Sequence, residues 1–314
     1  MITTKNTSLT PKRPVWTRVK KAKFLYLMLI IPLVYVFIFN YIPISGIVMA
    51  FQQYSPRDGI FASEWVGAYN FMRFFNSPVF WNVLGNTLSI SLYSLIASFP
   101  FPIILAVLVN HCLLPRFKKG VQTITFAPYF ISAVLLVGLL SQLLSIRSGI
   151  VNAVLERLGQ PRVDFMGNPG LFSHIYVWTG IWQQTGYSAI IYISALAGVD
   201  PTYHEAARID GANMWRRVWH IDLATIRPTV VIMLVLSVGS IVNVDFERAF
   251  LMQNPINLSA SEIISTYVYK VSVATQRPDY SFGTAIGLFQ NVISVTLTLL
   301  VNKIVDKLTG DGMF

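Results

Sequence analysis

The sequence is poor in charge and almost free of cysteine. Only 12% of its 314 residues are charged, whereas a soluble domain carries about 25%. This shortage of charge excludes a cytosolic enzyme and a disordered chain, since both need more charge to face water. The single cysteine, Cys112, excludes an internal disulfide and a CxxC metal site. The chain is therefore not a disulfide-stapled secreted domain either.

The sequence also lacks the motifs of several enzyme classes. It has no GxxxxGK[ST], so it cannot cradle the phosphates of ATP by itself. It has no HExxH and no GxSxG, and no nucleophile stands beside a base. The four histidines do not form a metal-ligand set; they are His111, His174, His204 and His220. We therefore expect no catalytic residue, metal or cofactor in this chain, and we assign any catalysis to a partner.

Long apolar runs fill most of the chain. Hydrophobic residues make up 54% of it, and its mean hydropathy is +0.56. Each run reaches the length of about 20 residues that crosses a hydrocarbon core of about 30 Å. Each must be a helix, because backbone polar groups in lipid have to be satisfied within the segment. We expect an all-α polytopic membrane protein with six transmembrane helices. The expected spans cover residues 24–51, 84–109, 121–144, 171–197, 229–252 and 282–305.

The distribution of Lys and Arg predicts the orientation. Of the 24 basic residues, 16 lie in the amino-terminal tail, the second and fourth connections and the carboxyl end, and 8 lie on the other side. Cytoplasmic segments carry such an excess, so both termini are expected in the cytoplasm. The net charge of +10 then indicates anionic lipid and not nucleic acid. The predicted parts are a basic cytoplasmic tail (1–23), one transmembrane domain (24–305) and a short cytoplasmic tail (306–314).

The fourth connection, about 200–228, has the pattern of a cytoplasmic helix–turn–helix. Asp200 before Pro201 predicts a helix start, with an N-cap and a proline at the first helical position. Gly211 after Asp210 predicts a stop, because glycine takes the left-handed conformation freely. A second short helix is expected from Ala212 to about Ile221.

This connection resembles the EAA loop of ABC importer permeases. The matching positions are Glu205, Ala206, Ala207, Gly211, Ile221 and Leu223. The sequence departs from the family at Ala224, where a proline is usual, and a proline follows later at Pro228. The resemblance implies that these six residues couple the permease to an ATPase. The competing interpretation is a basic interfacial helix pair with no special function.

The resemblance extends over nearly the whole chain after the basic tail. It includes YLMLIIPLVYVFIFNYIPISGIVMAF from Tyr26, FFNSPVFWNVLGNTLSISLYSL from Phe74, FKKGVQTITFAPYFIS from Phe117 and VNVDFERAFLMQNP from Val242. These stretches are similar to the LplB-type carbohydrate permeases, a group within the maltose-type, type I importers. The resemblance implies the type I ABC importer (MetI-like) permease fold in a bacterial cell membrane.

The same resemblance implies the partners. They are a second homologous permease, which makes a heterodimer, two cytoplasmic ABC ATPase subunits that bind ATP and Mg, and an extracytoplasmic sugar-binding protein or lipoprotein. The implied substrate is an oligosaccharide, whose binding-protein-dependent uptake is coupled to ATP hydrolysis through the EAA loop.

Polar and aromatic residues inside the spans are candidates for the substrate path, because such groups usually face a cavity or a partner helix. Trp178 and Trp182 share one helix face because they are four residues apart. Aromatic faces beside amides suit a sugar, although tryptophan also anchors span ends and glutamine also bonds neighbouring helices. Asp245 and Arg248, three apart, are expected to pair. The candidates are Trp178, Trp182, Gln183, Tyr187, Asn243 and Glu247.

Two other functions stay open at this point. The first is import of a non-sugar solute, such as a peptide or a polyamine, which the EAA loop alone does not separate from sugar import. The second, less favoured, is a membrane enzyme of the glycosyltransferase type, which needs a carboxylate or metal constellation that the sequence does not offer. An ATP-independent carrier would have no use for an EAA loop.

Overall fold

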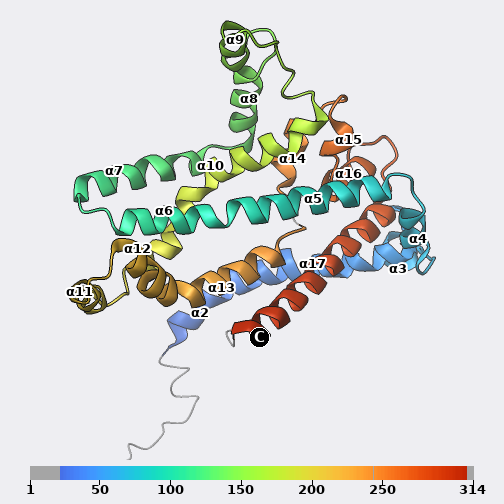
Figure 1. The fold of residues 1–314 in the computed structure, drawn as a ribbon. Helices are drawn as coiled ribbons and strands as arrows, with labels where there is room; N and C mark the ends of the chain where they lie inside the picture. Colours follow the sequence, from blue (N-terminus) through green and yellow to red (C-terminus); the bar gives the residue numbers. More distant parts are fainter. Residues whose placement is uncertain (1–21, 243, 310–314) are drawn as a thin grey trace, which may run out of the picture.

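The computed structural model describes residues 22–242 and 244–309, and its helices confirm the predicted all-α class (Figure 1). Residues 1–21 and 310–314 lie outside the described residues, and with them most of both predicted tails. Within the described residues, four helices are long and apolar enough to span a membrane, and a bent pair makes a fifth candidate. The four are Lys23–Phe51, Phe80–Asn110, Met214–Gly239 and Tyr280–Lys307.

The first span leads into a group of short elements. The span combines α2 (Lys23–Val36), the π-helix η1 (Phe37–Tyr41) and the 3₁₀ helix η2 (Ile42–Phe51). The described residues then form an antiparallel ribbon in which Gln52 pairs with Trp65. The short elements are β1 (Gln52–Gln53), α3 (Gly59–Ala62), β2 (Glu64–Trp65) and α4 (Tyr69–Phe75).

The third expected span is not one straight helix. It is α7 (Pro115–Phe126) with the 3₁₀ helix η3 (Ala127–Phe130), followed by α8 (Ala133–Leu143) at an angle of 97°. The Ser132 hydroxyl begins α8 by accepting a hydrogen bond from the backbone N–H of Leu135. The single helix predicted over 121–144 was therefore wrong. The sequence did not indicate the bend, because hydropathy continues through it. In Figure 1, α8 and α9 (Ile150–Arg157) rise above the other helices.

The central helix is α10 (Pro169–Leu196), which is 28 residues long. It begins at the N-cap Asn168, whose side chain accepts a hydrogen bond from the Gly170 N–H. It corresponds to the expected span 171–197, although polar residues along it keep its hydropathy below that of the four apolar spans. It packs along α5 (Phe80–Ser98) and α6 (Pro100–Asn110), which together make the second span.

The fifth expected span ends earlier than predicted. The helices α11 (Pro201–Ile209) and α12 (Met214–Arg217) lead through the π-helix η4 (Val218–Asp222) into α13 (Leu223–Gly239). The chain then leaves helical geometry and resumes as α14 (Phe246–Met252), so the predicted helix over 229–252 was wrong. The remaining helices are α15 (Leu258–Ser261), α16 (Ile264–Ser272) and α17 (Tyr280–Thr309).

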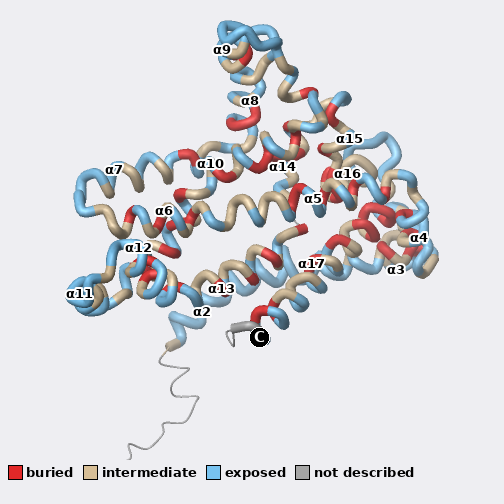
Figure 2. Tube along the Cα trace, in the orientation of Figure 1, coloured by how far each residue is buried: buried red, intermediate tan, exposed pale blue. Residues whose placement is uncertain are grey.

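Many buried residues lie where the central helix meets its neighbours, others lie between α4, α5, α16 and α17, and the outer faces are exposed and largely apolar (Figure 2). One core joins α10 to α5, α8 and α14, and includes Ile90, Val137 and Ile181. A second joins α10 to α6 and α13, with Tyr192 packed near Ile226. Because α10 takes part in both cores, its position determines where the cavity along its side lies and where the loop after its end begins.

Candidate functional site

The loop after α10 lies at the end of the molecule formed by α11 and α12 (Figure 1). Its first helix begins as predicted, with Pro201 at its start and the Asp200 carboxylate accepting a hydrogen bond from the Thr202 N–H at 2.9 Å. This hydrogen bond holds the pKa of Asp200 below its ordinary value. The cap is therefore a carboxylate, the charge that a helix N-terminus favours.

Gly211 forms the turn between the two helices and has a φ of +74°, which confirms the predicted left-handed conformation. Its N–H donates to the Arg208 carbonyl, and the Ala212 N–H donates to the Ala207 carbonyl at 2.8 Å. The chain then enters α12 at Asn213, whose side chain accepts from the Arg216 N–H. The second helix thus begins at Met214 and not at Ala212, and it continues into α13.

The structure places the six EAA-loop residues in two groups. Glu205, Ala206 and Gly211 are exposed, and Ala207 is half-buried beside them. Ile221 and Leu223 are half-buried where η4 joins α13. The first group is thus free for a partner, whereas the second attaches the loop to the span.

Large apolar side chains surround the first group of loop residues. The side chains of Ile209 and Trp215 are 87% and 75% exposed. Helix α11 itself has no buried residue. An exposed apolar surface of this kind is typical of a protein–protein contact.

Sequence reasoning missed a polar cluster beneath the loop. Asp222 is fully buried, and its carboxylate contacts the Nε2 atom of His111 at 2.6 Å and that of His204 at 3.3 Å. His111 ends α6 and His204 belongs to α11, so the cluster connects the loop to two spans. No local pattern indicated it, because its members are distant along the chain.

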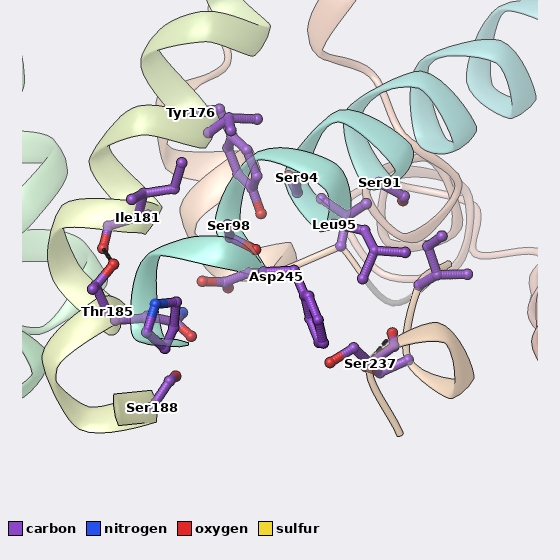
Figure 3. A pocket seen from close by; sticks show the side chains of 18 of the residues that line it. Ser91, Ser94, Leu95, Ser98, Tyr176, Ile181, Thr185, Ser188, Ser237 and Asp245 are labelled. Carbon is purple, nitrogen blue, oxygen red and sulfur yellow. Dashed lines mark hydrogen bonds between the residues drawn. The ribbon is translucent and has the colours of Figure 1, made fainter. Parts of the chain in front are cut away.

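A cavity of about 320 Å³ lies between α5, α10 and the end of α13. Its walls carry hydroxyl groups and one amide, and Figure 3 shows Ser98, Thr185 and Ser237 around the same space. The residues of α10 that line it run from Tyr176 to Tyr192, which is about 24 Å along a helix at 1.5 Å per residue. The polar lining consists of Ser91, Ser94, Ser98, Gln184, Thr185, Ser188, Ser237, Ser240, Asp245 and Arg248 with the two tyrosines.

The predicted Asp245–Arg248 pair is present at this cavity. Asp245 is the N-cap of α14, and its carboxylate lies 3.9 Å from Nε of Arg248. The pair was predicted inside a continuous span. It lies instead at the start of α14, where the chain becomes helical again.

The tryptophan face of α10 does not line this cavity. Trp182 precedes Gln184 by two residues, which is about 200° of rotation around a helix. Trp178 donates a hydrogen bond from Nε1 to the Tyr93 hydroxyl at 3.0 Å. Trp178 and Trp182 are 50% and 54% exposed.

Gln183, Tyr187 and Glu247 do not line the cavity either. Gln183 donates to the Ile131 carbonyl at 2.7 Å, at the break between η3 and α8, and Tyr187 stacks on Tyr129. Glu247 is exposed on α14 and Asn243 lies outside the described residues. The role of the six predicted residues as substrate contacts stays a prediction. The sequence did not indicate the hydroxyl-rich face of α10 that lines the cavity.

Comparison with known proteins gives the class to which this fold and loop belong. Residues 22–310 match the family model described as "Binding-protein-dependent transport system inner membrane component". The chain belongs to this family, so it is a membrane permease of a binding-protein-dependent transport system and not an enzyme. The resemblance of the chain to importer permeases is confirmed, and the coupling role of the EAA loop stays a prediction.

Two relatives from Bacillus subtilis (strain 168) are each 38% identical to the chain. The polygalacturonan/rhamnogalacturonan transport system permease protein YteP aligns with 93% of this chain over 90% of its own length. Protein LplB aligns with 94% of this chain over 92% of its own length. The similarity to LplB-type permeases is therefore confirmed.

Solved structures share the fold. One is a bacterial ABC transporter involved in the import of the acidic polysaccharide alginate, with a TM-score of 0.85 and 35% identity over 94% of this chain and 99% of that one. A second is the bacterial alginate transporter in complex with an alginate pentasaccharide-bound periplasmic protein, with a TM-score of 0.86 and 34% identity over 95% and 99%. The type I importer permease fold predicted from the sequence is confirmed.

Proposed function

We propose that this permease carries oligosaccharides, delivered by an extracytoplasmic binding protein, through the cavity between α5, α10 and α13. The 38% identity to YteP, a permease protein of a polygalacturonan/rhamnogalacturonan transport system, over 93% of this chain supports this function most directly. The cavity agrees with it, because hydroxyl and amide groups along about 24 Å of helix match the hydroxyl rims of several sugar rings. A peptide or polyamine importer finds no comparable support.

The coupling step follows from the exposed loop. A second, homologous permease completes the transmembrane pair, and two cytoplasmic ATPases bind ATP and Mg. The surface around Gly211, with Ile209 and Trp215, is the contact with one of these ATPases. Closure of the ATPase pair moves this loop and changes the side to which the cavity opens, so coupling is a difference in contact energy between two states.

Replacing Gln184 by alanine should lower uptake, because its amide lines the cavity. Loss of one ordinary hydrogen bond costs about 1 kcal/mol, or about fivefold in uptake at limiting sugar. The matched variant is Trp182→Ala on the opposite face of α10, which should change uptake little. Uptake of labelled oligosaccharide by proteoliposomes measures both. A larger loss for Trp182→Ala would place the substrate on the tryptophan face and contradict the cavity.

The single thiol tests the proposed orientation. Cys112 follows α6 at the same end as His111 and the loop, and is half-buried. A membrane-impermeant maleimide should leave it unlabelled in intact protoplasts, because both termini and the loop are cytoplasmic. As the control, Gln160→Cys in a Cys112→Ser background should be labelled from outside, because Gln160 is exposed after α9. Labelling of Cys112 alone in intact protoplasts would reverse the orientation.

A further inference from the structure

Arg248 is a buried cation at the wall of the cavity. It lies on α14, is only 5% exposed, and is among the residues that line the space. Its guanidinium carbon lies 4.0 Å from the centre of the Tyr176 ring, which holds the planar group in place. An arginine remains charged even in such surroundings, so its charge needs a partner.

The described residues do not supply that partner fully. Nε and Nη1 of Arg248 are buried and have no hydrogen-bond partner. Asp245, the only carboxylate lining the cavity among the described residues, approaches Nε no closer than 3.9 Å. Its other oxygen accepts the backbone N–H of Arg248 at 3.3 Å, and its side chain is 45% exposed. A buried charge without close partners is costly, so a ligand anion would complete the site.

Gly180 provides the room for the guanidinium. A Cβ atom at this position would lie 2.6 Å from Nη1 and 3.0 Å from Nη2 of Arg248. Both atoms belong to the flexible end of the side chain, so any larger residue would displace the guanidinium from its present position. The sequence of α10 therefore keeps the charged end of Arg248 at the cavity wall.

We propose that Arg248 binds a carboxylate of the substrate, and that the permease is selective for acidic oligosaccharides containing uronate residues. The guanidinium fork matches a carboxylate with two parallel hydrogen bonds. A phosphate dianion fits less well, because Arg248 is the only cationic residue lining the cavity among the described residues and Asp245 is close by. This proposal rests on the cavity as the oligosaccharide path.

The test compares one sugar with and without its charge. The full importer is reconstituted in liposomes, and the probes are a short oligogalacturonate and the same oligosaccharide with its carboxyl groups reduced to alcohols. The binding protein is the same throughout, so its own preference cancels when a variant is compared with the wild type. The change in the ratio of acidic to neutral uptake between a variant and the wild type therefore reports on the permease.

The Arg248→Gln variant should lower the ratio of acidic to neutral uptake by about 10- to 100-fold, the range expected for a charged hydrogen bond. Arg248→Lys should give an intermediate ratio, since it keeps the charge and loses the fork. Arg277→Gln removes the same charge at an exposed position that does not line the cavity, and should keep the wild-type ratio. If Arg248→Gln does not assemble, Gly180→Ala replaces it and should lower the ratio by displacing the guanidinium.

Equal losses for both sugars, or no loss for either, would overturn the proposal and make Arg248 a structural residue. The same holds if the wild type takes up the reduced sugar and not the acidic one. Failure of the wild type to take up either sugar is a separate result, because it counts against oligosaccharide transport itself and removes the basis of this proposal with it.

Discussion

Replacing Gly211 by valine should weaken the contact with the ATPase, and with it sugar-stimulated ATP hydrolysis, while leaving the permease in the membrane. The turn residue has a φ of +74°, and a residue with a side chain pays about 1–2 kcal/mol to adopt this conformation. Space is not the obstacle, because a Cβ atom at Gly211 would meet nothing within 4 Å. The strain is relieved by a change of the turn, which moves Trp215 relative to α11. Co-purification of the ATPase and sugar-stimulated ATP hydrolysis in liposomes should both fall at least tenfold, since 1.4 kcal/mol corresponds to tenfold and lost docking contacts add to it.

The chain offers a matched control for this strain. Gly159, after α9, also has a φ of +74° and open space around its Cβ position. Gly159→Val therefore imposes the same backbone cost at the opposite side of the protein, away from the loop. It should preserve ATPase binding and stimulated hydrolysis. If the two variants behave alike, general destabilisation and not coupling is being measured.

Replacing Asp222 by leucine should also weaken coupling, because it removes the centre of the His111–Asp222–His204 cluster. The carboxylate is fully buried and holds the Nε2 atom of His111 at 2.6 Å. Leaving a buried donor without its acceptor costs about 1–3 kcal/mol, or about 5- to 100-fold in an equilibrium. His204 is on the same helix as the EAA residues, so the loop loses a direct connection to α13. Sugar-stimulated hydrolysis should fall more than assembly does.

Two further variants separate coupling from packing. Asp222→Asn keeps an acceptor for His111 and should retain more stimulated hydrolysis than Asp222→Leu. His204→Ala combined with Asp222→Leu should be little worse than Asp222→Leu alone, because residues in one network do not act additively. Fully additive effects, or normal hydrolysis in Asp222→Leu, would show that the cluster does not link the loop to the spans.

Hydropathy was sufficient to place the first, second, fourth and sixth expected spans, and local chemistry was sufficient to place the loop. The Asp200 cap and the Gly211 turn are effects of neighbouring residues, so the sequence carries them directly. The bend of 97° before α8 was not predictable in this way, because the residues around it stay apolar while the backbone changes direction.

Which face of α10 meets the cavity was beyond the sequence. Aromatic rings and amides favoured the face of Trp178 and Trp182 as the substrate face. Trp178 instead donates a hydrogen bond to Tyr93 and does not line the cavity. The orientation of α10 depends on its contacts with α5, α6 and α13, which are separated from it by many residues. Serine hydroxyls such as Ser98 gave no local signal, and the position of Arg248 became informative only with Gly180 and Tyr176 around it.

The central claim is that this permease couples uptake of oligosaccharide to ATP through the EAA loop, with a binding protein as donor. The most direct measurement is uptake of labelled oligosaccharide by liposomes that contain the complete importer. The account predicts uptake only when ATP is inside and binding protein is outside, and loss of this uptake in Gly211→Val with Gly159→Val unaffected. Uptake without ATP or without binding protein, or normal uptake in Gly211→Val, would contradict it.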